Sequence, residues 1–206
     1  MRVRLIYEKR GGACFVPHVA LATVFARSLR RAEILPCSTG GFSPRAKMSF
    51  GPELPAGVVA LGEAVDLWLK GQPEHLVPLL NSQMPDGFRA LACAFLPESA
   101  PALGKECRAA RYLTRTRNGR SPEELLNCLR RHLGADLLSA SEEGPWLSLV
   151  VTDPARNGLG GWVKALVGEG LAAGWQDLCF VRLALGTWDG ANLRALGEGA
   201  RYGQGK

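Results

Sequence analysis

The sequence lacks the cysteine spacings that hold metal clusters. Its six cysteines are scattered: no two form a C-x-x-C pair, and none shows the C-x₃-C-x₂-C spacing of a radical enzyme's cluster. Isolated cysteines of this kind are usually small buried hydrophobes. We therefore expect no metal site and no cofactor, and we do not expect the chain itself to be a radical enzyme.

Membrane segments and nucleotide loops are also missing. No apolar run is long enough to span a bilayer, and no charged region followed by an apolar run opens the chain. The glycines at 158–161 do not have the G-x-G-x-x-G form of a dinucleotide loop. The 206 residues, 47% of them hydrophobic, therefore predict a soluble, cytoplasmic protein with no membrane partner and one large or two small domains.

Positive charge is unevenly distributed. The net charge is +6, yet residues 1–50 carry nine Lys or Arg against two acids, while residues 51–100 carry two against six. A basic N-terminal block suggests an anionic partner such as RNA.

A loop at residues 38–50 gathers glycine, an aromatic, a Ser-Pro turn and two cations. Its shaping residues are Gly40, Gly41, Phe42, Ser43 and Pro44. The glycines permit backbone angles closed to other residues, and Pro44 biases Ser43 toward an extended geometry. We expect Phe42 to anchor the loop on the core, while Arg45 and Lys47 stay in water. The loop is a candidate anion site, although a long helix-to-strand connection needs similar residues merely to turn.

Four segments resemble a known family. They are RVRLIYEKRGGACFVPH at 2–18, RSLRRAEI at 27–34, GGFSPRAKMSFGPELPAGV at 40–58 and EAVDLWL at 63–69. Together they resemble the uncharacterised bacterial family of radical-SAM-linked proteins, closely over the first third of the chain. The family's name reflects its association, as neighbour or fusion, with radical S-adenosylmethionine enzymes. The resemblance therefore implies such an enzyme as a partner and implies no particular activity.

Apolar periodicity predicts the order β-α-β-β-α-β twice. Strands are expected at 2–9, 46–50, 63–70 and 88–96 and helices at 18–33 and 73–84; then strands at 107–117, 137–140, 146–151 and 178–185 and helices at 122–133 and 157–173. The predicted fold is α+β, with two ferredoxin-like units in tandem, antiparallel sheets and helices on one face. We place the units at 1–97 and 107–190, a linker at 98–106 and a flexible tail at 191–206.

Arginines recur on the predicted open faces. Alternation directs Arg2 and Arg4 to one face of the first strand, and Arg111, Arg115 and Arg117 to one face of the fifth. Arginine forks grip phosphates and stack on bases, and sheet platforms hold single-stranded RNA. Two alternatives remain open at this point. Asp66 on a neighbouring strand could pair with Arg4, or the two sheets could pack against each other.

A helix and a histidine complete the set of candidates. The predicted helix at 18–33 places Arg27, Arg30 and Arg31 on one face. His18 stands where the family usually shows Ser-His-Leu-Asp, but here the residues are Pro-His-Val-Ala, so the acid is absent. Near a helix N-terminus we expect His18 to be neutral at pH 7, as a general base would be. CRISPR RNA-processing endonucleases, which are tandem ferredoxin-like proteins, sometimes use such a histidine, an analogy by fold alone.

These features favour a non-catalytic accessory protein that binds RNA or presents a substrate to a radical SAM enzyme. One alternative is a metal-independent ribonuclease that uses His18. A second is a scaffold whose open faces are occupied by a partner protein.

Overall fold

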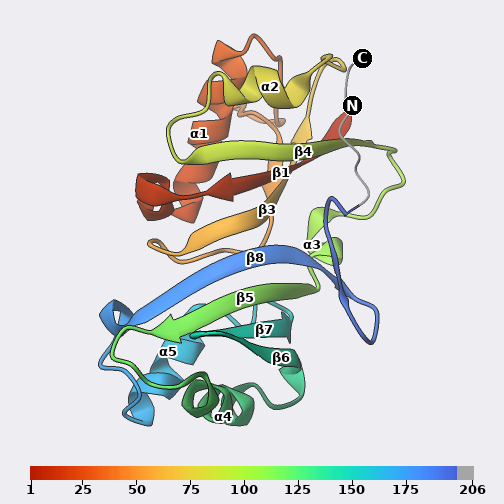
Figure 1. Ribbon diagram of the computed structural model, residues 1–206. Coiled ribbons are helices and arrows are strands. Elements are labelled where there is room, and N and C mark those ends of the chain that lie inside the picture. The colour runs from red at the N-terminus through yellow and green to blue at the C-terminus, as the bar shows by residue number, and fades with distance from the viewer. Residues whose placement is uncertain (199–206) are drawn as a thin grey trace.

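The computed structural model describes residues 1–198, a mixed α/β chain built on one nine-stranded sheet (Figure 1). Seven strands follow the order β4-β1-β3-β8-β5-β7-β6, while β2 pairs with β3 and β9 with β8. The strands are β1 (Arg2–Lys9), β2 (Met48–Phe50), β3 (Val59–Trp68), β4 (Phe88–Leu96), β5 (Ala109–Thr116), β6 (Leu137–Glu143), β7 (Trp146–Thr152), β8 (Leu178–Trp188) and β9 (Leu193–Ala195). The helices are α1 (His18–Arg31), α2 (Leu76–Asn81), α3 (Leu103–Glu106), α4 (Pro122–Leu133) and α5 (Leu159–Gly168), with 3₁₀ turns at Gly11–Phe15, Gly134–Asp136 and Trp175–Asp177.

Every strand and helix that the periodicity predicted is present, although α2 and α5 are shorter than expected. The helix expected around Pro78 begins at Leu76, so the proline falls in its first turn, where no backbone donor is needed. None of the helices within residues 1–198 is long and apolar enough to cross a membrane.

The two halves of the chain join edge to edge in one sheet. They are therefore neither separate sheets nor packed face to face. Strand β2 covers only residues 65–67 of β3, so the beginning of β3 keeps a free edge. Strand β8 pairs there in parallel, with Val59 opposite Val181. We call this β3–β8 contact the seam. The sequence placed the start of the strand at Glu63, and so missed the residues that join the halves.

Each half buries an aromatic pair between its helices and its strands. In the first half, Tyr7 of β1 meets Phe25 of α1 edge to face, with ring centroids 5.0 Å apart. In the second half, Tyr112 of β5 meets Trp162 of α5 at 5.1 Å in the same manner. All four side chains are almost inaccessible to solvent. These contacts hold α1 and α5 against the sheet, because large aromatic rings bury much apolar area.

The predicted linker and tail contain regular structure. Helix α3 lies within 98–106 and inserts the buried side chain of Leu103 into the larger apolar core. Strand β9 lies within 191–206 and pairs with β8, and Leu196 packs against the same core. The sequence missed both elements because they are short and their burial depends on distant strands. Residues 199–206 of the predicted tail lie outside the described residues.

The N-terminus of α4 is closed by the predicted cap. The backbone N–H of Glu124 donates to the Ser121 hydroxyl (3.2 Å), and the Glu124 carboxylate accepts from the Ser121 N–H (2.9 Å). This reciprocal pair is a capping box with Pro122 at the first helical position.

We expect Ser121→Ala to lower the free energy of unfolding by about 1 kcal/mol, because the cap satisfies an otherwise free backbone donor. Urea denaturation followed by circular dichroism measures the change. Replacing the exposed Ser99 by alanine is the matched control, with an expected change within about 0.5 kcal/mol. Equal effects of the two substitutions would contradict the role of the cap.

Candidate nucleic-acid interface

The arginines of β1 are engaged inside the protein. Arg4 is buried and donates to both carboxylate oxygens of Asp66, from Nε at 2.8 Å and from Nη2 at 3.1 Å. Arg2 donates to the backbone oxygens of Ala100 (2.9 Å) and Pro101 (2.8 Å). The expectation that Arg2 and Arg4 stand on an open face is therefore wrong. The 98–106 segment lies over that face, and the cross-strand pair with Asp66 is the alternative that the structure adopts.

The arginines of β5 face solvent. Arg111 and Arg115 are exposed, whereas Tyr112 and Thr114 between them are buried, as the alternation predicted. Arg117 follows the end of the strand and is also exposed. Within residues 1–198 none of these three guanidinium groups forms a salt bridge with an acid. They are thus free to meet an external anion.

Arg115 lies over an aromatic ring. Its guanidinium carbon is 4.7 Å from the centroid of the Trp146 ring, which belongs to β7. The attraction between the cation and the ring restrains the guanidinium on the sheet surface, while the exposed side chain stays open to a ligand. The sequence did not single out Trp146, because its place depends on the strand register: Thr114 pairs with Leu147, which brings Trp146 beside Arg115.

A groove of about 450 Å³ adjoins this stack at the start of β8. Phe15, Trp146, Trp175 and Arg117 contribute to its walls. The Phe15 side chain is 72% exposed and Trp175 is 43% exposed, which is unusual for such large apolar groups. The sequence assigned Trp175 to packing. It does contact a core ring edge to face, but nearly half of it remains available.

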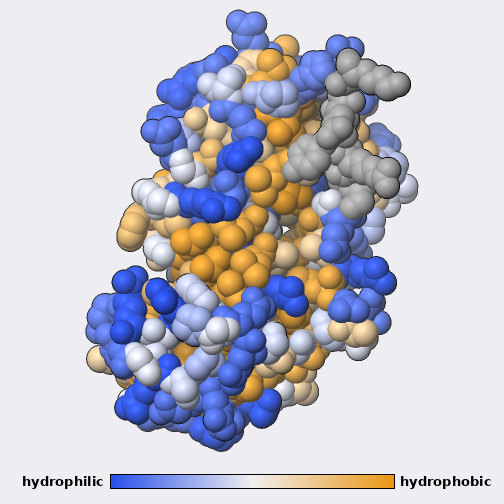
Figure 2. Space-filling view, in the orientation of Figure 1, coloured by the Kyte–Doolittle hydropathy of each residue, from blue (hydrophilic) through white to orange (hydrophobic). Residues whose placement is uncertain are grey.

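Apolar surface continues from this groove along the seam. Figure 2 shows hydrophobic surface gathered in the middle of the molecule, where β3 and β8 lie in Figure 1. The strand register aligns Leu113, Val181 and Val59 as neighbours across β5, β8 and β3, and all three are half-buried. The open face therefore combines an apolar strip with arginines at its β5 side. We call the β5 arginines, Trp146 and the adjoining groove the arginine face.

The loop at 38–50 is exposed and partly ordered by its own backbone. Thr39 N–H donates to the Arg45 backbone oxygen (2.7 Å), and Arg45 N–H donates back to the Thr39 hydroxyl (3.1 Å). Gly41 has φ of +100°, a conformation that favours glycine. Phe42 is fully exposed, so the expectation that it anchors the loop on the core is wrong. The tip of the loop, from Thr39 to Arg45, is held by these two hydrogen bonds, and Phe42 does not anchor it.

The other predicted cations are exposed but lie apart from β5. Arg27, Arg30 and Arg31 project from α1, and Arg45 and Lys47 project from the loop. The Lys47 ammonium lies 4.7 Å from the ring centroid of Trp68. The four arginines lie on or beside α1, whereas Lys47, over Trp68, lies on the opposite face of the sheet, the one that carries Arg2. None of these five residues lines the groove of the arginine face, and β5 lies in the other half of the sheet from α1 (Figure 1).

His18 is the first residue of α1 and is half-buried against Phe50, with ring centroids 5.9 Å apart. Burial lowers its pKa below the usual histidine value, so the ring is neutral at pH 7, as predicted. The cause differs from the expected one, because desolvation and not the helix end is the main contribution. No hydrogen bond joins its side chain to another residue of the described part, and His75 and His132 lie on other elements. The arrangement gives a catalytic His18 no acid–base partner.

A buried ion pair at the seam was missed by the sequence reasoning. Arg182 of β8 is inaccessible to solvent and donates two hydrogen bonds to the Glu63 carboxylate of β3, one of them from Nε at 2.6 Å. Its Nη2 also donates to the Pro52 backbone oxygen (2.8 Å). Burial alone would lower the pKa of Arg182, but the Glu63 charge and the Tyr112 phenol raise it, so the residue stays charged. The sequence signal that could have revealed this pair is Arg182 itself, a single arginine inside an otherwise apolar strand.

The sequence matches the model of a bacterial protein family. A family model described as "Uncharacterized protein conserved in bacteria (DUF2344)" matches residues 2–142. The chain belongs to this family. No curated protein matches the chain. The DUF2344 match crosses the boundary between the halves and ends in β6, so the family includes β5 and α4 and not only the β1–β4 half. Among residues 1–198 of this DUF2344 protein, no three His, Cys, Asp or Glu side chains come together as metal ligands would.

Proposed function

We propose that this DUF2344 protein binds single-stranded RNA on its arginine face. The observation that carries the proposal is the stack of Arg115 on Trp146 beside a groove with exposed aromatic rings. Single-stranded nucleic acids are held by cationic tracks for phosphates and by aromatic rings for bases, each stacked base contributing about 1–3 kcal/mol. Arg111 on the same strand and Arg117 just after it supply further cations without a salt bridge to an acid of residues 1–198.

A second element of the proposal concerns architecture. The first half has the strand order β4-β1-β3-β2 and the second has β8-β5-β7-β6. In both halves the fourth strand of the half therefore lies beside the first, followed by the third and the second. With two helices in each half, these orders support our proposal of two ferredoxin-like units in tandem. Sheets of this kind expose the face that the helices leave free, which here is the face of Arg111 and Arg115.

The partner enzyme is a further part of the proposal. We propose that RNA binding serves a radical SAM enzyme, for which this protein presents the substrate. This part is supported by the sequence resemblance to radical-SAM-linked proteins. The direct measurement is a pull-down in which the purified protein captures the enzyme, run with and without added RNA. We expect capture to depend on the RNA.

The test is filter binding of cellular tRNA and rRNA at several salt concentrations. We expect tight binding to the natural protein and a loss of about 100-fold in the triple Arg111, Arg115, Arg117→Ala variant. The salt slope should fall by about 2, since each neutralised phosphate of a single strand contributes about 0.7. The matched control is the triple Arg27, Arg30, Arg31→Ala variant, which removes the same charge from α1. We expect that control to lose less than about threefold.

Two outcomes would refute RNA binding on the arginine face. One is binding that is indifferent to salt between about 50 and 200 mM, because phosphate contacts release counterions. The other is an equal loss in the α1 control, which would show that net charge alone attracts the RNA. Circular dichroism of both variants confirms that each is folded.

A further inference from the structure

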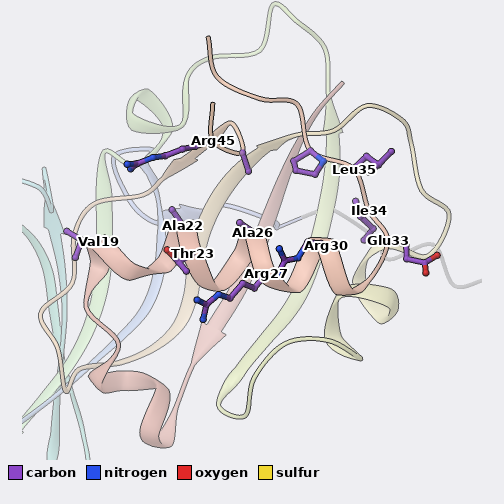
Figure 3. A pocket seen from close by; sticks show the side chains of 12 residues that line it. Val19, Ala22, Thr23, Ala26, Arg27, Arg30, Glu33, Ile34, Leu35 and Arg45 are labelled. Carbon is purple, nitrogen blue, oxygen red and sulfur yellow. The ribbon is translucent and has the colours of Figure 1, made fainter. Parts of the chain in front are cut away.

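A second groove runs along the exposed side of α1, away from the arginine face. It has a volume of about 640 Å³ and lies between α1 and the chain that follows it, residues 33–46. Val19, Ala22 and Ala26 form the helix wall, and Leu35 and Pro36 form part of the opposite wall (Figure 3). The Val19 side chain is 85% exposed and Leu35 is 66% exposed, so both walls are apolar and open to a ligand.

The opposite wall is held in place by backbone hydrogen bonds. Lys70 N–H donates to the Leu35 backbone oxygen (2.9 Å), and Cys37 N–H donates to the Trp68 backbone oxygen (2.7 Å). Lys47 N–H in turn donates to the Cys37 oxygen (2.8 Å). The groove is therefore largely formed before a ligand arrives, which lowers the ordering cost of binding.

Arginines line this groove. Arg27 and Arg30 project from α1, and Figure 3 shows Arg45 reaching from the loop over the N-terminal half of the helix. None of the three forms a salt bridge with an acid in the part of the chain that the structure describes. Glu33 is the one acid among the described residues that line the groove, and it stands at the far end. The unpaired charge favours an anionic ligand.

The walls decide which anion fits. Apart from the arginines, the described walls are mainly aliphatic and contain no aromatic ring, so they offer no aromatic surface on which a nucleobase could stack. The helix wall from Val19 to Arg30 is about 17 Å long at 1.5 Å per residue, which matches a peptide helix of about twelve residues. Aliphatic side chains would enter such a groove and flanking carboxylates would meet the arginines, as in helix-in-groove recognition.

We infer that this groove binds an acidic amphipathic helix of a partner protein. The inference is independent of RNA binding, because the groove belongs to α1 and its following loop and not to β5. The protein would then hold a partner on its first half and RNA on its second half.

The inference is tested with a fluorescein-labelled synthetic helix of about sixteen residues, built from Leu, Ala and Glu with the leucines on one face. Fluorescence anisotropy measures its affinity for the full chain. We expect the double variant Arg30→Glu, Arg45→Glu to bind at least about tenfold more weakly. The control is Arg31→Glu, Lys47→Glu, which makes the same charge change at exposed neighbours that do not line the groove. We expect that control to change affinity less than about twofold.

Other results would overturn the inference. No binding of the peptide at about 1 mM would refute it, and so would an equal loss in the control variant. A peptide with glutamine in place of every glutamate that bound equally well would show that charge plays no part. A further result is displacement of the peptide by oligouridylate or by dodecanoate. If that displacement is lost only in the Arg30→Glu, Arg45→Glu variant, the groove belongs to nucleic acid or to a small amphiphile instead.

Discussion

Glu63→Gln is expected to lower the free energy of unfolding by about 3–5 kcal/mol. The substitution leaves the Arg182 guanidinium buried at the seam without its counter-charge, and breaking a buried pair on one side costs about this much. Since domains are stable by only about 5–15 kcal/mol, the loss should be visible as a large shift of the urea midpoint.

The control for this prediction is an ion pair on the surface. Glu169→Gln removes the partner of Arg131, where the two side chains are 39% and 63% exposed, and we expect a change below about 1 kcal/mol. A double variant, Glu63→Leu with Arg182→Met, should recover much of the lost stability, because apolar residues can replace a buried pair. A Glu63→Gln effect no larger than that of the surface control would contradict the buried geometry.

Gly62→Ala should be the second most disruptive change, because the glycine sits where β3 approaches β8. A Cβ at this position would lie 2.4 Å from the Leu183 backbone oxygen and 3.1 Å from the Ala184 Cα. Both are backbone atoms of β8, so a side chain cannot simply move aside, and the strands must separate. We expect the free energy of unfolding to fall by about 2–4 kcal/mol.

Gly71→Ala is the matched control for the seam. This glycine is exposed, and an added Cβ would meet nothing within 4 Å. Alanine there should be neutral or slightly stabilising, because it reduces the freedom of the unfolded chain. Urea denaturation of both variants checks the prediction. Equal stability of the two would mean that β3 and β8 tolerate a wider separation than the structure shows.

The seam also bears on the proposed function. The apolar strip of the open face crosses it from Leu113 to Val59, while the cations lie on β5. If Gly62→Ala separates the strands without unfolding the second half, RNA binding by Arg111 and Arg115 should persist. Loss of binding in that variant would indicate that the ligand spans both halves.

Local pattern gave accurate positions for most elements. The alternation of β5 predicted that Arg111 and Arg115 face outward, and the Ser121 cap predicted the start of α4. The faces of β5 and the cap of α4 both depend on residues close in sequence, so they could be predicted without knowing which elements pack against them. The same reasoning failed for Arg4, because its exposure depends on the 98–106 segment, which covers β1 from about a hundred residues away.

Aromatic residues of the arginine face could not be identified from the sequence. Trp146, Trp175 and Phe15 come from three separate elements, and each alone is typical of a packing residue. Their common feature is that they line one groove at the surface, which only the arrangement of β7, the turn before β8 and the segment after β1 determines. The unpaired α1 arginines were predicted as exposed, but the groove they line depends on how residues 33–46 fold back along the helix.

The sequence by itself determined the succession of strands and helices, the outward faces of β5 and α1, and the absence of clustered cysteine spacing. Periodicity and capping are local properties, and they fix these features. Only the tertiary structure decided that the two halves share one sheet, that Arg4 and Arg182 are buried with acids, and that aromatic rings gather beside Arg115. The reason is physical: Glu63 and Arg182 are 119 positions apart, and their pairing depends on a strand edge left free by the shortness of β2.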